Sequence, residues 1–243
     1  MPTRIGWNRD QLLMALRLYM RTPFGRLHGK NPEIIALAKK IGRTPDALAM
    51  KACNFASIDP KLNQKGLKGS SQADRAIWAE FEGNPTKLAV EAEEAAERFN
   101  VGVDEHELNI EIPTGATERE SLVKVRRIQS FFRAAVLISY DQRCAVTGIA
   151  IPELLVASHI IPWSASVDQR ADPKNGLCLS ALIDRALLTL DLNLAVVLSK
   201  LLCERIHDAP FDCSLIAIDG KKLRVPRRFP TAGDALDYHR MRV

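Results

Sequence analysis

The sequence contains no apolar run that approaches the about 18 residues that a membrane-spanning helix needs. Its N-terminus, MPTRIGWNRD, has no apolar segment behind the first charges, so we do not expect a secretion signal. These two absences predict a soluble, cytoplasmic protein with no membrane partner. A length of 243 residues, of which 47% are hydrophobic, is sufficient for one or two domains with ordinary cores.

Cysteine is scarce, and its spacing excludes two common roles. An odd number of cysteines with no C-x-x-C pair argues against a disulfide framework and against a four-cysteine zinc site. We interpret them as free thiols in a reducing cytoplasm. The five are Cys53, Cys144, Cys178, Cys203 and Cys213.

Charge is distributed in three blocks. Residues 1–68 hold 13 Lys and Arg against 4 Asp and Glu, whereas residues 69–120 hold 4 against 13. Residues 121–243 hold 17 against 12, a mild excess that is equally typical of an ordinary surface. A strongly basic block attracts a polyanion through counterion release, so the first block favours nucleic acid as partner.

The first 60 residues predict a helix-turn-helix. Residues 9–21 repeat apolar side chains at helical spacing, a second helix is predicted from Pro32 to Gly42, and a third begins at Thr44 with Pro45 as its first residue. Two short helices joined by a glycine-containing turn are typical of DNA-binding domains, although they also occur in plain bundles. The predicted core-facing set of the third helix is Ala47, Leu48, Met50 and Phe55.

Polar residues in and around this motif are candidates for DNA contacts. Arg43 lies at the N-terminus of the third helix, where free backbone N–H groups also favour a phosphate. Lys51 suits a phosphate, and Asn54 suits an adenine edge or the backbone. The predicted contacts to double-stranded DNA are Arg21, Arg26, His28, Arg43, Lys51 and Asn54.

The middle of the chain predicts two acidic helices with solvated faces, over 72–82 and 85–99. Residues 101–118 lose periodicity and contain Gly, Pro and acids, which predicts a linker. A further helix is predicted over 119–139. The predicted organisation is therefore α+β: a helical DNA-binding domain in 1–100, a linker in 101–118 and a second domain in 119–243.

The second domain begins with short β-branched runs. RCAVTGI (143–149) and LLVASHIIPW (154–163) predict a two-stranded hairpin, and residues 175–188 predict a turn leading into a helix. The result is a small ββα unit. A lone histidine in such a run, as His159 is, usually belongs to a hydrogen-bonded core.

Three residues of this unit together suggest phosphodiester hydrolysis. His159 could take a proton from water, beside a divalent cation held by Asp184 on the helix. Asn175 could lock the hairpin through bonds from its side chain to the backbone and so orient the histidine.

The motifs CAVTG, ASHIIPW, RADPKNGLCL and IDRALL resemble those of the HNH endonucleases, which are ββα-metal nucleases. The segment LRVPRRFPTAGDALDYHR resembles the tail of many such proteins. The resemblance implies a metal-dependent DNA endonuclease, with His159 as general base and Asn175 as the structural asparagine.

The helix departs from the family pattern. That pattern would place His, Asp, Phe and Asp at positions 183, 184, 187 and 188, where this chain has Ile183, Asp184, Leu187 and Leu188. The predicted metal ligands are therefore Asp184 and, weakly, Ser158, with Asp191 out of register as a substitute. We expect Mg²⁺, Mn²⁺ or Ni²⁺ to be weakly held, because one carboxylate binds a hard cation poorly.

The segments TPFGRLHGKNPEIIALA and GRTPDALAMKACNFASIDP resemble the sulfur-binding domains of modification-dependent restriction enzymes, which recognise phosphorothioate DNA. Sulfur is larger and less hydrated than oxygen, so its reader needs a small apolar cavity beside cationic donors. The resemblance suggests that Pro23, Pro32, Pro45 and Ala47 line such a cavity.

Two functions follow. The first is a modification-dependent restriction endonuclease acting in phage defence, for which a homodimer would suit cutting of both strands. The second is a non-catalytic reader of modified DNA that recruits or regulates a partner. An RNA-directed nuclease is a weaker third, because the helix-turn-helix argues against it.

Overall fold

The computed structural model describes residues 6–60, 62, 69–101, 116–186, 189–191, 193–198, 217–226 and 228–242. The chain divides into two compact units, Met1–Ala135 and Val136–Val243. The division falls within helix α6, Ala116–Ser139, and the linker predicted at 101–118 lies mostly outside the described residues. No described helix is both long and apolar enough to cross a membrane. The predicted α+β class is confirmed.

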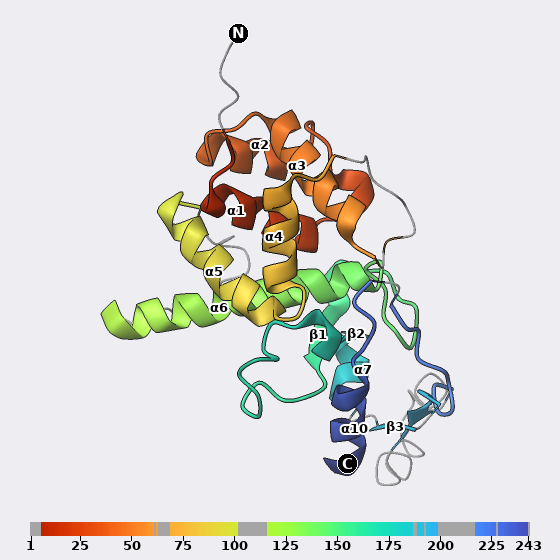
Figure 1. The fold of residues 1–243 in the computed structure, drawn as a ribbon. Coiled ribbons are helices and arrows are strands. Elements are labelled where there is room, and N and C mark those ends of the chain that lie inside the picture. Colours follow the sequence, from red (N-terminus) through yellow and green to blue (C-terminus); the bar gives the residue numbers. More distant parts are fainter. Residues whose placement is uncertain are drawn as a thin grey trace. The chain divides into compact units, whose positions relative to one another are not determined.

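The first unit is helical (Figure 1), and its helices begin where the sequence places capping residues. Asn8 forms a capping box with Gln11 at the start of α1, and the Thr44 side chain accepts from the backbone of Ala47 at the start of α3. Gly42, just beyond α2, has φ of 68°, which suits a glycine that ends a helix. The helices of this unit are α1 (Arg9–Arg21), the short η1 (Phe24–Arg26), α2 (Pro32–Lys40), α3 (Pro45–Ile58), α4 (Gln72–Phe81) and α5 (Pro85–Arg98), followed by α6.

Helix α1 is central to this unit, because it packs against α3, α4 and α5. Its Tyr19 is buried, and the phenol donates a hydrogen bond of 2.6 Å to Asp59 Oδ2. Leu48 and Phe55 of α3 are fully buried, as predicted. Met50 is not: half of its surface is exposed, since α3 turns this face away from the core.

Asp74 makes a buried polar centre between α3 and α4. Its Oδ1 lies 2.8 Å from Lys51 Nζ, and its Oδ2 accepts from Asn54 Nδ2 at 3.3 Å and from the backbone of Ser71 at 2.9 Å. Asp74 is inaccessible to solvent, and Lys51 and Asn54 are buried. The expectation that Lys51 and Asn54 face DNA is therefore wrong for this conformation, because both side chains are occupied in satisfying a buried carboxylate.

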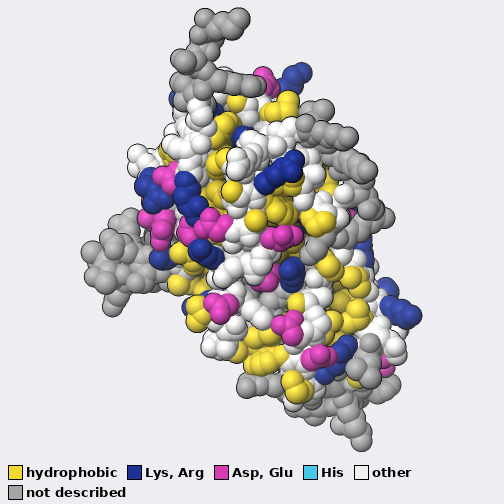
Figure 2. All heavy atoms as spheres, in the orientation of Figure 1, with side chains coloured by type: hydrophobic (Ala, Val, Ile, Leu, Met, Phe, Trp, Pro, Cys, Tyr) yellow, Lys and Arg dark blue, Asp and Glu magenta, His cyan; other side chains and the backbone are white. Residues whose placement is uncertain are grey.

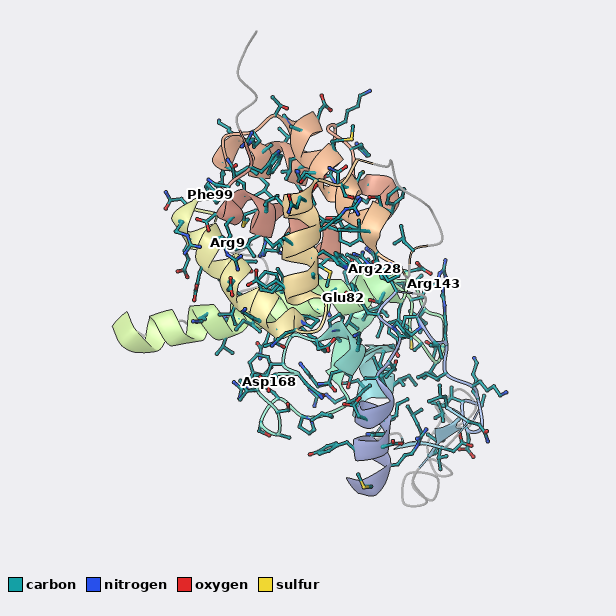
Figure 3. All side chains as sticks on the ribbon, in the orientation of Figure 1. Arg9, Glu82, Phe99, Arg143, Asp168 and Arg228 are labelled. Atoms are coloured by element: carbon teal, nitrogen blue, oxygen red, sulfur yellow. The ribbon has the colours of Figure 1, made fainter. Side chains whose placement is uncertain are left out.

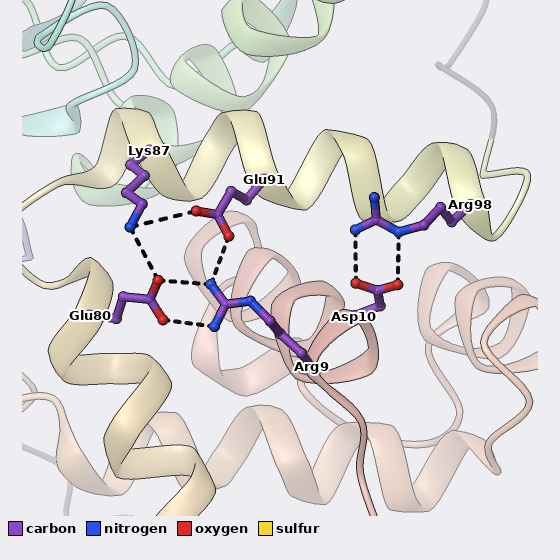
Figure 4. Close-up of polar contacts among 6 residues, drawn as sticks. All are labelled: Arg9, Asp10, Glu80, Lys87, Glu91 and Arg98. Atoms are coloured by element: carbon purple, nitrogen blue, oxygen red, sulfur yellow. Dashed lines mark hydrogen bonds and ion pairs between the residues drawn. The ribbon is translucent and has the colours of Figure 1, made fainter.

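The acidic helices α4 and α5 pair with α1 (Figure 4). Arg9 of α1 holds both oxygens of Glu80 at 2.8 Å and one oxygen of Glu91 at 2.7 Å, and Lys87 bridges the same two glutamates. Arg98 of α5 makes a two-bond pair with Asp10 of α1. Part of the acidic face that the sequence predicted as solvated thus stabilises contacts between helices.

The second unit is a small ββα arrangement, in which η3 (Pro152–Leu154) leads into β1 and η4 (Pro173–Asn175) leads into β2. Strands β1 (Leu155–His159) and β2 (Gly176–Ser180) are antiparallel, with His159 opposite Gly176. Helix α7 (Ala181–Arg185) follows directly and contacts both strands. The remaining elements are β3 (Thr189–Leu190), paired with β4 (Val196–Val197), and α10 (Gly233–Arg242), which contacts β3.

The predicted hairpin partner of β1 was wrong. The segment 143–149 forms a turn instead of a strand, in which Gly148 has φ of 77° and donates to the Cys144 carbonyl. The partner is GLCLS, 176–180, which is buried at all five positions, so its continuous apolar pattern is that of a core strand. Cys53, Cys144 and Cys178 are free thiols as expected, and Cys203 and Cys213 lie outside the described residues.

Replacing Asp74 with Ala should destabilise the first unit by about 3–5 kcal/mol, because it leaves the Lys51 ammonium buried without its partner. Urea unfolding followed by circular dichroism measures this. Asp46→Ala is the matched control, since Asp46 also lies in the first turn of a helix but is exposed. Equal losses in the two variants would contradict a buried ion pair at Asp74.

The pairing of Glu80 with Arg9 predicts a pH dependence. The hydrogen bonds from Arg9 lower the pKa of Glu80 to about 2, below the value of about 4.3 expected in the unfolded chain. The pair therefore stabilises the fold fully above pH ~5, and that contribution is lost as pH falls towards 2. Glu80→Gln should lower the free energy of unfolding at pH 7 by less than ~1 kcal/mol, since both side chains are partly exposed.

This difference between wild type and Glu80→Gln should disappear near pH 2 and shrink in high salt. Glu82→Gln, on the exposed end of the same helix, serves as control. A difference that persists unchanged at pH 2 would show that Glu80 acts through packing instead of charge.

Candidate functional site

The connection between β1 and β2, residues 160–175, is held by one buried side chain. Asn175 Oδ1 accepts from the backbone of Ile161 at 2.8 Å, and Nδ2 donates to the carbonyls of Ile161 at 3.1 Å and Gln169 at 3.2 Å. The Asn175 carbonyl also accepts from Ile160 at 3.0 Å. These bonds tie the start, the far side and the end of the connection together, which is the lock that the sequence predicted for this asparagine.

His159 ends β1 and is oriented by the same connection. Its Nε2 lies 2.9 Å from the carbonyl oxygen of Arg170. Since a carbonyl only accepts, Nε2 carries the proton in the neutral ring, and the lone pair is on Nδ1. Burial lowers the pKa of His159, whereas the bond to the Arg170 carbonyl acts in the opposite direction. A neutral imidazole of fixed tautomer can accept a proton.

The residues around His159 hold that orientation. Trp163 packs edge-on against the imidazole, with ring centroids 5.8 Å apart. The Arg170 guanidinium lies over Trp163 at 5.0 Å, and its Nε donates to the Trp163 carbonyl at 3.0 Å. Arg170, whose carbonyl binds His159, is therefore itself held in place. Figure 3 labels Asp168, which belongs to the same connection.

A cavity of about 180 Å³ opens beside this histidine. Strand β1 contributes Ser158 and His159, helix α7 contributes Asp184, and the C-terminal helix α10 contributes His239. The other lining residues are apolar and include Ile183, Leu177 and Leu179. The cavity brings together the predicted general base and both predicted metal ligands.

The donor set suits a divalent cation only in part. Among the described residues, no three His, Cys, Asp or Glu side chains form a group that could by itself hold a metal ion. Asp184 and Ser158 offer oxygen donors to the cavity, which fits a cation whose other ligands are water and substrate phosphate. Asp191, the possible substitute, is occupied: its Oδ1 accepts from the backbones of Asn193 and Ala195.

The residue identities account for the reduced set, because isoleucine at position 183 and leucine at position 188 offer no donor atom. Helix α7 ends at Arg185 with Ala186 as C-cap. Leu187 and Leu188 themselves lie outside the described residues. Ile183, where the family pattern has His, is buried in the core.

The predicted DNA contacts of the first unit are dispersed. Arg43 lies over the ring of Trp7 at 4.7 Å and also bonds Gln11 and the Gly6 carbonyl. Arg21 lines a cavity of about 350 Å³ with Arg17, Lys40 and Arg127. Arg26 and His28 are exposed on the loop before α2.

The proposed sulfur-cavity residues are at most partly covered. Pro32 is exposed at the start of α2, while Pro23, Pro45 and Ala47 are half-buried.

On the face drawn in Figure 2, Lys and Arg side chains lie among Asp and Glu side chains, so the charges there are mixed.

His239 is the site residue that sequence reasoning missed. It lies 80 positions after His159 in a segment that offered no spacing signal. A detectable signal was the helical pattern: Ala235 and Leu236 are buried, and His239 falls on the same face at i+4 and i+3.

Asn175→Ala should destabilise the second unit by about 2–4 kcal/mol, since it leaves the buried N–H of Ile161 and two carbonyls without their partner. Urea unfolding gives this value, and hydrogen exchange of the segment 160–175 should show that the Ile161 amide loses protection. Asn193→Ala, an exposed asparagine of the same unit, is the control. Unchanged protection at Ile161 would contradict the lock.

Comparison with known proteins supports the resemblance for this segment. No curated protein matches the chain. Residues 144–187 match the family model described as HNH endonuclease. The matched residues run from the turn before β1 to the end of α7, and they include His159, Asn175 and Asp184. The second unit therefore contains a segment, residues 144–187, that is similar to the HNH endonucleases.

Proposed function

We propose that this protein is a metal-assisted DNA endonuclease in which His159 is the general base. The observation that carries the proposal is the bond between His159 Nε2 and the Arg170 carbonyl, in a segment that matches the HNH endonucleases. That bond fixes the tautomer in which Nδ1 can accept a proton. Ser158 and Asp184 lie at the same cavity.

The chemistry follows from this geometry. His159 Nδ1 takes a proton from water as the water oxygen attacks the phosphorus, the bond from phosphorus to the leaving oxygen breaks, and the leaving oxygen is protonated from solvent. A divalent cation held by Asp184, with Ser158 beside it, would stabilise the charge that develops on the phosphate oxygens. Asn175 acts through His159, because it holds the connection that supplies the Arg170 carbonyl.

The first unit would supply binding to double-stranded DNA. Helices α2 and α3 contact each other and are joined by a turn that contains Gly42, as in a helix-turn-helix. Arg26, His28 and Lys30 are exposed beside this pair. With Lys51 and Asn54 buried, the exposed loop residues Arg26, His28 and Lys30 are candidates for contacts to phosphates in this region.

We further propose that the DNA is phosphorothioate-modified, so that the protein restricts modified DNA in phage defence. Support comes from the resemblance of 22–38 and 42–60 to sulfur-binding domains, and from half-buried Pro23, Pro45 and Ala47 near exposed His28. A dimer would place two nuclease units on one duplex. The cytoplasm is where such a target would be met.

A second function is favoured by a specific observation. Ile183 is buried in the core where the family pattern has a ligand, and α7 ends after five residues. A protein of this kind could read modified DNA without cutting it and recruit a partner. Both functions retain DNA binding, so cleavage is the measurement that separates them.

Phosphorothioate-modified supercoiled plasmid should be nicked by the wild type with Mn²⁺ or Ni²⁺, and plain plasmid serves as the comparison. His159→Ala should reduce the nicking rate by about 100-fold or more, as expected for loss of a general base. Its DNA affinity in a gel-shift assay should be unchanged. Nicking confined to modified plasmid would support the sulfur preference.

Two results would contradict parts of this proposal. Binding of modified DNA without nicking under any metal would favour the non-catalytic reader. Equal affinity for plain and modified duplexes would remove the sulfur specificity while leaving the endonuclease intact.

A further inference from the structure

We infer that His239 of the C-terminal helix is a metal ligand of this site, paired with Asp184, and that it biases the site towards transition metals over Mg²⁺. The inference rests on the proposed nuclease function of the cavity. It assigns a role to a residue outside the matched segment 144–187. The juxtaposition that carries it is one small cavity lined by Ser158, His159, Asp184 and His239.

The cavity is small, with a volume of about 180 Å³. Its other walls are apolar, including Ile183, Leu190 and Leu223.

Helix α10 is anchored so that His239 stays at this cavity. Ala235 and Leu236, on the same helical face, are buried. The neighbouring Arg240 bonds the Asp191 carbonyl at 3.0 Å and Asp237 at 2.9 Å. At the start of the helix, Ala232 donates to the Lys174 carbonyl at 3.1 Å, one residue before Asn175. Helix α10, which carries His239, is thus bonded to η4, the element that contains Asn175.

The two histidines have different proposed roles, because the ring of His159 is held by a bond to the backbone. His159 is held through Nε2 to Arg170 and serves as base, so it is not needed as a ligand. Asp184 and His239 then form a pair of one oxygen and one nitrogen donor, fewer than the three side chains of a site made by protein alone. Phosphate oxygens and water would complete the shell.

This donor pair predicts metal preference. Imidazole suits Ni²⁺ and Zn²⁺, whereas Mg²⁺ and Mn²⁺ prefer oxygen ligands, and affinity for nitrogen-containing sites rises from Mn²⁺ to Ni²⁺. Two carboxylates on one helix would instead suit Mg²⁺. If the imidazole of His239 is a ligand, the affinities of the protein for Ni²⁺ and for Mg²⁺ should therefore differ.

The test is calorimetric titration of untagged protein with Ni²⁺, Mn²⁺ and Mg²⁺, because a histidine tag would bind nickel. Each titration is made without DNA and with a duplex in the His159→Ala background, which removes cleavage. Wild type should bind Ni²⁺ most tightly, and His239→Ala should weaken Ni²⁺ binding by about tenfold or more, as expected for loss of an imidazole ligand. His239→Asp should narrow the gap between Ni²⁺ and Mg²⁺.

Controls separate this from adventitious binding and misfolding. His28→Ala, at an exposed histidine of the first unit, should leave Ni²⁺ affinity unchanged in the titration without DNA. Asp184→Asn should weaken it as His239→Ala does. Co²⁺ absorption bands should shift in His239→Ala, and circular dichroism and thermal melting should show that each variant is folded.

The inference is overturned if folded His239→Ala keeps the Ni²⁺ affinity and the Co²⁺ spectrum of wild type. It is also overturned if wild type binds none of these metals with or without DNA. Nicking that depends on His159 but not on His239 would contradict this inference and support the proposed nuclease. Metal binding through His239 without nicking would support this inference and contradict the proposed nuclease.

Discussion

The side-chain amide of Asn175 makes three bonds inside a connection of sixteen residues, between two strands of five residues each. Strands so short cannot fix a long connection by their own ladder, so its shape depends on where its polar groups are satisfied. The side-chain amide of Asn175 can donate two hydrogen bonds and also accept one. It therefore bonds the connection at two places, Ile161 and Gln169. The position of the Arg170 carbonyl, and with it the tautomer of His159, depends on this closure.

Charge in the first unit is used differently from what its basic composition suggests. Arg9, Arg17 and Lys51 from the basic block pair with Glu80, Glu93 and Asp74 from the acidic block. Two segments of opposite sign thus neutralise each other by packing as helices. Other cations of the basic block, such as Arg26 and Lys30 on the loop before α2, are exposed.

The second unit combines a fixed orientation of His159 with few donor groups for a metal among the described residues. Ile183 is buried in the core, and Asp184 is a carboxylate at the cavity. The orientation of His159 does not depend on α7, because its Nε2 is bonded to the Arg170 carbonyl in the connection. The role proposed for His239 concerns the affinity of the site for a metal.

The sequence by itself determined the helices of the first unit, since Asn8, Asn31 and Thr44 with Pro32 and Pro45 specify helix starts through local bonds. Motif spacing also identified His159, Asn175 and Asp184 as one group. Tertiary structure decided what depends on contacts far apart in the chain: the pairing of β1 with 176–180 instead of 143–149, the burial of Lys51 and Asn54 against Asp74, and the arrival of His239 at the cavity. Local propensity carries no information on these, because each is settled by which partner satisfies a buried polar group or strand edge once the chain has packed.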